Sequence, residues 1–469
     1  MSARAWGLAT GLAAALAATV AGAQTGGHPP RPEPGPTPAL HLPKIVVRKL
    51  SNGITVGVLE NHTLPLVAVS AIIEAPSLLD PQGKEGVARL TATMMAEGTT
   101  TMSADQLTSA EADLGSGVSA RGFFTITRNV DRSLEIMADE LLHPLFPQSS
   151  LDRIKTNTLA GLQRQKDNPQ YLAGRVFADA VYGAGHPYAR HETEASVKAI
   201  TRADLIAFHR DYYRPRNTTL VVVGDMTPDA AVARLERAFA HWTGGGKSGE
   251  VHVPDPKPLG PTAIHLYDRP GSPQSMVLVG QLGPRRDNKD YYALDLLNTT
   301  LGGAFNSRLN LDLREAHGWT YGAQSGLSWR RVPELSTWEM GTAVSTPKTD
   351  SALVNLVADV NGLRGTKPVT DSEVSFAKRT ATLSLPLQFA TIEQMAGAAA
   401  GLFEEHLPLD YYDHLVDNYN RVTVADVNAA AQKYLDPSHE AIVVVGDGKT
   451  ITPGIQAAHL APVQPVAAF

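Results

Sequence analysis

An internal repeat is the feature that most constrains the fold of this chain of 469 residues. A shift of 222 residues brings "TRADLIAFHRDYYRPRNTTLVVVGD" (201–225) onto "TVADVNAAAQKYLDPSHEAIVVVGD" (423–447) without a gap. Both copies read as a helix, a turn around a proline, and an apolar strand that ends in Val-Val-Val-Gly-Asp. The repeat therefore predicts two similar α/β domains in tandem, and two such domains form a clamp whose inner surface can hold a ligand.

The N-terminus has the layout of a secretory signal. In "MSARAWGLATGLAAALAATVAGAQ" one basic residue, Arg4, precedes an apolar run of about 15 residues and then small residues at Ala21 and Ala23. This run is short for a membrane-spanning helix, which is the alternative interpretation. We expect cleavage before Gln24, export to a bacterial periplasm, and no membrane span afterwards.

Breaks in composition give the expected domain limits. Gly- and Pro-rich stretches interrupt the chain after the signal and again near its middle. Asn52-Gly53, between two β-rich runs, predicts a hairpin with a two-residue turn. The expected organisation is a signal peptide (1–23), a Pro-rich leader (24–43), an N-terminal domain (44–242), a linker (243–262), a C-terminal domain (263–449) and a loose tail (450–469).

Composition excludes several kinds of site. The chain has no cysteine, so disulfides, zinc–thiolate sites and thiol nucleophiles are all excluded. Its formal net charge of −6 gives no reason to expect nucleic acid or an anionic membrane as partner.

The stretch "GKEGVARLTATMMAEGTT" (83–100) reads as one amphipathic helix. Val87, Leu90, Met94 and Met95 form an apolar stripe along one face. Arg89, Ala92 and Thr93 lie roughly opposite this stripe, at the i, i+3, i+4 spacing with which a helix directs ligands to one metal ion. None of these three residue types is a metal ligand, so the helix is either an ordinary surface helix or a metal site without its ligands.

Four stretches together resemble the insulinase and pitrilysin family of metallopeptidases, which includes the mitochondrial processing peptidase. They are "GKEGVARLTATMMAEGT", "GAGHPYARHETEASVKAITRADLIAFHRDYYRPRNTTLVVVGD", "LGGAFNSRLNLDLREAHGWTYGAQSG" and "LPLDYYDHLVDNYNRVTVADVNAAAQKYLDPSHEAIVVVGD". With the spacing between them they cover roughly residues 44 to 450. The resemblance implies an α+β fold of two homologous domains, each a mostly antiparallel sheet covered by helices.

In catalytic members of this family the first helix carries His-x-x-Glu-His, in which the histidines bind zinc and the Glu activates water. The resemblance places Arg89, Ala92 and Thr93 on these positions. A third ligand, a Glu, is expected within "LDRIKTNTLAGLQRQKDNPQ" (151–170), which contains none. At 4 Å and an effective dielectric of 20, the charge of Arg89 would repel a dication by roughly 8 kcal/mol. We therefore expect no metal in this chain.

The family's second domain carries an Arg and a Tyr that hold substrate, and the resemblance places them on Arg314 and Tyr321. An Arg presents fixed donors to a carbonyl or carboxylate, and a Tyr hydroxyl can donate to a developing oxyanion. The alternative is a surface Arg–Glu pair and a half-buried strand Tyr. In the processing peptidase a Gly-rich loop of the non-catalytic subunit touches substrate, and Gly302 and Gly303 mark either a short form of that loop or a plain turn.

The sequence thus lacks the metal half of an active site and keeps the substrate half. In some family members these halves belong to two homologous chains, so the resemblance implies a heterodimer in which a partner with His-x-x-Glu-His supplies zinc and the general base. This chain would then be the substrate-binding, non-catalytic subunit of a peptide-cleaving metallopeptidase. The alternatives are a catalytically inert structural or binding protein of the same fold, and a stand-alone enzyme with an unfamiliar site.

Two further groups of polar residues contain the side chains that commonly bind metal ions. They are His186, His191, Glu192 and Glu194 in one loop, and Glu405, His406 and His414 near a predicted helix. Both groups have suitable donor atoms, although clustered polar side chains in a loop are usually only solvated.

Overall fold

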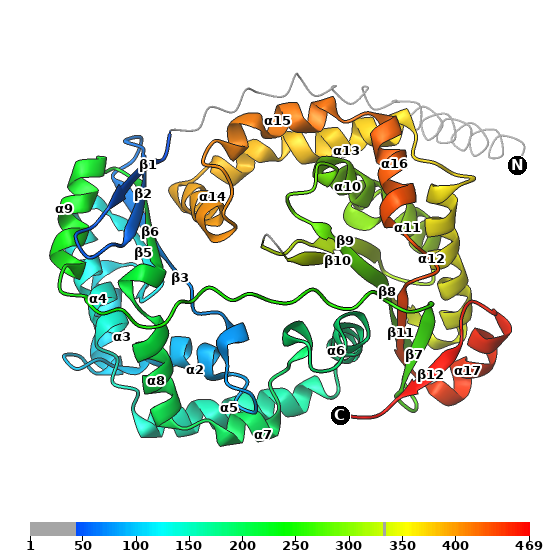
Figure 1. Ribbon diagram of the computed structural model, residues 1–469, viewed down its shortest axis with the longest axis horizontal. Helices are drawn as coiled ribbons and strands as arrows, with labels where there is room; N and C mark the ends of the chain where they lie inside the picture. Colours follow the sequence, from blue (N-terminus) through cyan, green and yellow to red (C-terminus); the bar gives the residue numbers. More distant parts are fainter. Residues whose placement is uncertain (1–43, 332–333) are drawn as a thin grey trace, which may run out of the picture. The chain divides into compact units, whose positions relative to one another are not determined.

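Each half of the repeat forms one six-stranded mixed sheet (Figure 1). The computed structural model describes residues 44–331 and 334–469, which belong to one unit, Leu40–Phe469. The first sheet consists, in spatial order, of β1 (Val46–Lys49), β2 (Thr55–Glu60), β6 (Thr218–Gly224), β3 (Leu66–Ile73), β5 (Gly122–Ile126) and β4 (Val118–Ser119). Only the β2–β6 pair is parallel.

The second sheet repeats this order, with one difference at its edge. Its strands are β12 (Val463–Val466), β7 (Ala263–Asp268), β11 (Ala441–Gly446), β8 (Gln274–Arg285), β10 (Leu335–Ser345) and β9 (Ala323–Ser328). The edge strand β12 comes from the C-terminal end of the domain, whereas β1 comes from the N-terminal end of its own. These two sheets confirm the predicted α+β class with two similar, mostly antiparallel domains.

Helices follow the strands in the same sequence in both halves. The first half contains α2 (Val87–Met94), α3 (Ala104–Leu114), α4 (Val130–Leu142), α5 (Gln148–Gln165), α6 (Pro169–Tyr182), α7 (Glu194–Ala199), α8 (Arg202–Tyr212) and α9 (Pro228–Phe239). The second contains α10 (Tyr291–Asn298), α11 (Arg308–Asn310), α12 (Thr349–Arg364), α13 (Asp371–Leu383), α14 (Ile392–Glu404), α15 (Tyr411–Arg421), α16 (Val424–Tyr434) and α17 (Gly448–Ala457). Two π-helical turns, η6 (Thr299–Gly303) and η7 (Leu311–Ala316), flank α11.

The repeated sequence explains the repeated structure at α8 and α16, whose bounds differ by the same 222 residues. Each helix begins with a capping box, formed by Thr201 with Asp204 and by Thr423 with Asp426. The apolar strand after each helix is buried on both faces. In β6, Leu220 and Val222 join the core of their own half, whereas Val221 and Val223 face the opposite side of the sheet.

Residues on that opposite side pack against a helix from the other half. The α14 helix of the second half covers β3 and β6 of the first sheet, and α6 of the first half covers β8 and β11 of the second. The two helices occupy equivalent places in the chain, because α6 lies between β5 and β6 and α14 lies between the corresponding strands β10 and β11. The halves are therefore interlocked, because each contributes one helix that covers the sheet of the other. No pattern in the sequence predicts this arrangement.

Two local predictions need correction. The hairpin around Asn52-Gly53 closes with a three-residue loop, because Leu50 N–H donates to Ile54 O and Gly53 adopts φ +93°. The expected loose tail contains α17 and β12, and β12 pairs in parallel with β7. Pro453 within α17 and Pro465 at the sheet edge obscured both elements, since proline usually disfavours helix and strand interiors.

The segment between the halves, 243–261, has no regular secondary structure, and side chains from both halves hold it in place. From the first half, Asn217 donates to Lys247 O and accepts from Gly249 N–H, and His186 bonds to Pro254 O. From the second half, Arg285 on β8 pairs with Asp255 at 2.6 Å. The expected signal peptide and leader lie outside the described residues. In the described part of the chain no helix is both long and apolar enough to cross a membrane.

Candidate functional site

The helix α2 is positioned by its apolar face and by one buried carboxylate. The four residues of the predicted stripe, Val87 to Met95, are all buried. Asp80 accepts hydrogen bonds from Gly86 N–H and Ala88 N–H at 2.7 Å each, which satisfies donors at the start of the helix. The fold therefore holds α2 rigidly, with Arg89, Ala92 and Thr93 on the face away from the core.

An ion pair occupies this outer face. Arg89 Nε and Nη2 each donate to the Glu192 carboxylate at 2.6 Å, and these hydrogen bonds raise the pKa of the Arg89 guanidinium. Thr93 Oγ1 donates back to Arg89 O at 3.0 Å. Because Glu192 compensates the charge of Arg89, the repulsion of about 8 kcal/mol expected for a bare arginine is an overestimate.

The residues present nevertheless do not fit zinc. Ala92 offers no donor atom, the hydroxyl of Thr93 is bonded to the helix backbone, and Glu192 is held by Arg89. Among the described residues no group of three or more His, Asp or Glu side chains is arranged to hold a metal ion. An acidic residue was predicted within 151–170, whereas the carboxylate beside α2 is that of Glu192, which no spacing rule connects to this helix.

The outer face of α2 borders a pocket of about 640 Å³. Strand β3 and the turn after it form one wall, and Arg121 and Tyr213 also reach the pocket. Ala400 and Glu404, on the exchanged helix α14, line it from the second half. A cleft of this size can accept several residues of an extended peptide, and the polar groups around it are of both signs.

The predicted substrate pair lies in the second half, on the segment between α11 and β9. Arg314 is on η7, and its side chain is half-exposed; its Nε lies 3.4 Å from Glu315 Oε1. Tyr321 is 92% exposed and precedes β9 by two residues, so it is not the half-buried strand residue of the alternative interpretation. Both polar groups are therefore accessible to a ligand, with no contact between them that would occupy the Tyr hydroxyl.

The two glycines before this segment are packing residues. Gly302 and Gly303 lie within the π-helical turn η6, not in a loop, and Gly302 is buried. A Cβ added to Gly302 would overlap the backbone nitrogen of Ser325 on β9. Exposure to solvent begins at Gly303, and Phe305 is 66% exposed.

In the two other groups with metal-binding donor atoms, the side chains contact separate partners. In the first, His186 bonds to Pro254 O, and Glu194 pairs with Lys166 and Lys198 rather than with a histidine. In the second, Glu405 pairs with Arg286, His406 with Arg331 and Glu74, and His414 with Asp410. His191 Nε2 is buried without a hydrogen-bond partner, whereas the other side chains named here each make a local contact, and neither group converges on one point.

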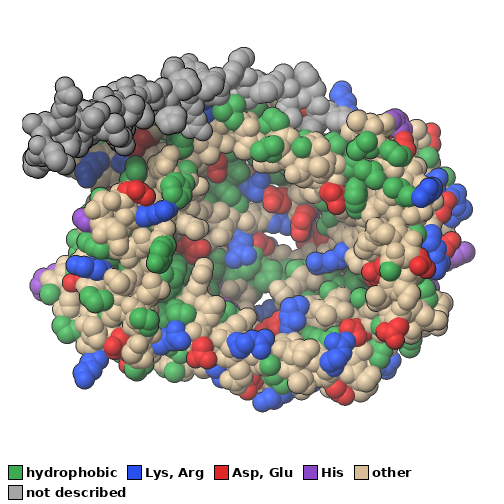
Figure 2. Space-filling view, turned by 180° about the vertical axis from the view of Figure 1, so that it is seen from behind, with side chains coloured by type: hydrophobic (Ala, Val, Ile, Leu, Met, Phe, Trp, Pro, Cys, Tyr) green, Lys and Arg blue, Asp and Glu red, His purple; other side chains and the backbone are tan. Residues whose placement is uncertain are grey.

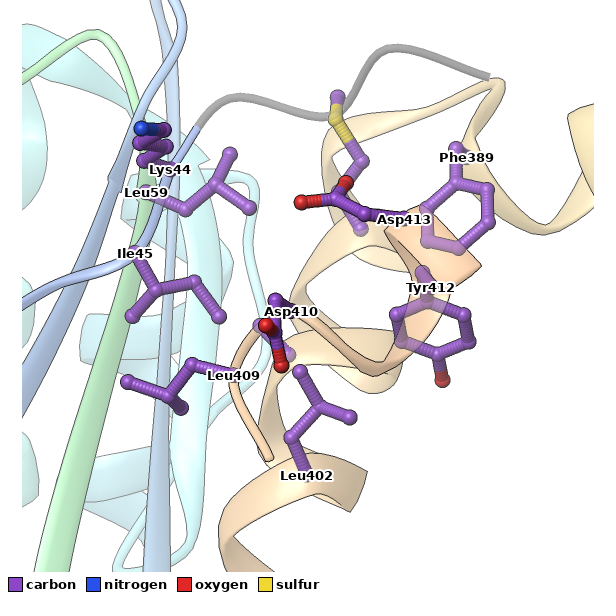
Figure 3. Close-up of a pocket in the computed structure, with 11 residues that line it drawn as sticks. Lys44, Ile45, Leu59, Phe389, Leu402, Leu409, Asp410, Tyr412 and Asp413 are labelled. Atoms are coloured by element: carbon purple, nitrogen blue, oxygen red, sulfur yellow. The ribbon is translucent and has the colours of Figure 1, made fainter. Parts of the chain in front are cut away.

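A smaller pocket of about 250 Å³ lies where α14 and α15 approach the first sheet (Figure 3). Figure 3 shows Ile45 and Leu59 on one side of it and Phe389 and Tyr412 on the other. The lining is mostly apolar, with Asp410 among its few charged groups. This pocket continues the apolar cluster that joins α14 to the first sheet, and it contains no predicted site residue.

The face of the molecule shown in Figure 2 gives no sign of a polyanion-binding surface. On the side shown in Figure 2, acidic and basic side chains are interspersed. The mixture agrees with the modest net charge of −6, because a nucleic-acid interface needs a contiguous basic area.

Comparison with known proteins places these features in a family. Two family models match the chain, described as insulinase (peptidase family M16) over residues 56–191 and as peptidase M16 inactive domain over residues 199–381. The Bacillus subtilis protein named uncharacterized zinc protease YmxG is 23% identical over 417 residues, which cover 85% of this chain and 97% of the relative. A Helicobacter pylori protein named non-peptidase homolog YmxG is 22% identical and covers 83% of this chain and 91% of its own length.

Comparison with solved structures gives the same family. A peptidase M16 inactive domain from Pseudomonas fluorescens superposes with a TM-score of 0.77 at 28% identity, covering 86% of this chain and 97% of the other. A protease from Helicobacter pylori also gives a TM-score of 0.77, at 20% identity over 86% of this chain and all of the other, which supports the fold alone. The resemblance found in the sequence is confirmed, and the chain belongs to the insulinase family of peptidases, M16.

Proposed function

We propose that this chain is the non-catalytic, substrate-binding subunit of an exported heterodimeric zinc metallopeptidase that cleaves peptides. A homologous partner with His-x-x-Glu-His would supply the zinc and the general base. The observation that carries the proposal is the pair Arg314 and Tyr321, which keeps two polar groups exposed on one short segment. The first domain, by contrast, has an ion pair where the metal ligands of a catalytic member would lie.

The chemistry of the pair suits the binding of a peptide bond. The guanidinium of Arg314 can donate to a substrate carbonyl or carboxylate, because its pairing with Glu315, at 3.4 Å, is weak. The hydroxyl of Tyr321 can donate to the oxyanion that forms when water attacks the peptide carbonyl. Neither group activates water, so this chain alone should not hydrolyse peptides.

Exposure of an aromatic side chain also supports this role. A Tyr that is 92% exposed buries almost no apolar surface and contributes little to stability. A structural explanation for Tyr321 is therefore weak, whereas a ligand would cover it. Export rests on the charge and apolar pattern of residues 1–23 and is tested by fractionation of cells that express the full chain.

Co-expression with a homologous chain that carries His-x-x-Glu-His tests the proposal. The purified complex should cleave an unstructured reporter peptide, and each chain alone should not. Tyr321→Phe and Arg314→Ala should each lower kcat of the complex by about a hundredfold to a thousandfold, on the scale of one lost oxyanion donor. Full activity of the double variant, or cleavage by this chain alone, would reject the assignment.

The second candidate is an inert binding or structural protein of the same fold. The name of the Helicobacter pylori relative, non-peptidase homolog, favours it. This candidate predicts that Arg314 and Tyr321 can be replaced without any effect on a partner's activity. Activity of the complex that depends on both side chains would therefore exclude it.

A further inference from the structure

Three of the large apolar side chains that are exposed in the described chain gather on one short segment. Phe305, Leu311 and Tyr321 are 66%, 52% and 92% exposed, and Arg314 lies between the last two in sequence. An aromatic ring that is mostly in water is unusual away from an interaction site. Leu387, at 67% exposure, provides a comparison at a distant place in the sequence, on the 3₁₀ turn before α14.

The ring of Phe305 lies under the guanidinium of Arg314. The Cζ atom of Arg314 is 4.5 Å from the centroid of the ring, within the range of a cation–π contact. This contact restrains a long side chain that is otherwise held only by the weak pairing with Glu315, 3.4 Å away. The rest of the ring stays accessible beside the donors of Arg314.

The fold fixes this arrangement through one buried side chain. Asn310 donates to Ala304 O at 3.4 Å, directly before Phe305, and accepts from Ala323 N–H at 2.9 Å, two residues after Tyr321. Asn310 therefore ties the turn that carries Phe305 to the start of β9. Gly302 allows the same turn to lie against β9, where any side chain would collide.

We propose that Phe305 is a specificity-determining residue that receives an apolar side chain of the peptide held by Arg314 and Tyr321. The inference rests on the proposed function, and it adds the kind of residue that the substrate carries next to the bound carbonyl. Arg314 and Tyr321 contact groups that every peptide has, so they cannot select a sequence. Phe305 is an exposed apolar surface in contact with the guanidinium, and an aromatic or aliphatic side chain would cover it.

Peptide binding by the full chain tests this inference. The probes are two fluorescein-labelled 12-residue peptides of Gly and Ser, one with a central Phe and one with Ser in its place. Fluorescence anisotropy should show about fivefold tighter binding of the Phe peptide by the unmodified protein. Phe305→Ala should abolish this preference, Phe305→Leu should keep most of it, and Leu387→Ala should leave it unchanged.

The outcomes separate the two proposals. Arg314→Ala should weaken both peptides by a similar factor, and no weakening at all would contradict the proposed function. Equal binding of the two peptides by the unmodified protein would overturn the role of Phe305, and so would an unchanged preference in Phe305→Ala. Equal weakening of both peptides by Phe305→Ala would also overturn it, because Phe305 would then only position Arg314.

Discussion

Because α6 of the first half covers the sheet of the second half, a single substitution on α6 should destabilise that sheet. Leu172 on α6 is 1% exposed and packs in one apolar cluster with Val443 and Val445 of β11. Leu172→Ala removes a buried isobutyl group from this cluster and leaves a cavity between α6 and the sheet. The expected loss of stability is about 3 kcal/mol, within the range for buried Leu→Ala changes.

Hydrogen exchange followed by mass spectrometry can locate this loss. Each 1.36 kcal/mol corresponds to a factor of ten in an equilibrium constant, so backbone amides of β11 should exchange roughly a hundredfold faster in Leu172→Ala. Leu205→Ala is the matched control, because Leu205 is fully buried in the core of its own half. In that variant the largest change should fall on α2, against which α8 packs, and β11 should keep its protection.

One result would refute the interlocked arrangement. If Leu172→Ala accelerated exchange in β6 and its neighbours while β11 kept its full protection, α6 would pack within its own half. The same experiment decides whether the halves can be studied apart. A chain that ends near residue 242 would expose the apolar face of α6, and it would lack the helix that covers Val221 and Val223.

Three further experiments test single features of the site and the core. A thermodynamic cycle can be built from Arg89→Met, Glu192→Gln and the double variant, with stabilities measured by urea unfolding. The coupling free energy should be about 1 kcal/mol, as for a partly exposed bidentate pair. Zero coupling would contradict the observed ion pair. Burial raises the pKa of Glu140 to about 7, so the fold favours the neutral acid and stability should fall as the pH rises from about 4.5 to 7. Glu140→Gln should flatten this dependence and stabilise the protein at pH 8 by about 3 kcal/mol, and a steeper dependence would show the sign to be wrong. Gly302→Ala should destabilise the fold by about 2 kcal/mol through overlap with β9, whereas Gly174→Ala, in the open interior of α6, should stabilise it by about 0.5 kcal/mol in the same thermal-unfolding assay.

Local sequence patterns predicted the elements that depend on local interactions. The apolar stripe of Val87, Leu90, Met94 and Met95 was predicted from its helical spacing, and these side chains are the buried face of α2 and the turn that follows it. The repeat located α8, α16 and the strands after them, since the capping residues and the doubly buried valines stand in the sequence itself.

Contacts between distant residues were not predictable in this way. Glu192 pairs with Arg89 across 103 positions, and Asn310 joins two backbone segments that no motif connects. The continuous apolar run of β6 indicated burial on both faces, yet it did not say that the second cover is a helix from the other half. Gly302 and Gly303 were predicted to mark either a short substrate loop or a plain turn, whereas in the structure they lie in the π-helical turn η6, where Gly302 allows close packing against β9.

The two halves place their predicted functional residues on different elements, and this explains how one set can be absent while the other persists. The α2 helix follows β3 in the first half as α10 follows β8 in the second, but Arg314 and Tyr321 lie farther along, between α11 and β9. The α2 helix remains necessary for the core whatever its outer face carries, because Leu90 and Met94 are fully buried. Tyr321 is exposed and contributes little to the core, so replacing it should leave the free energy of unfolding unchanged. Any loss of activity in such a variant must then come from the loss of a contact with a ligand.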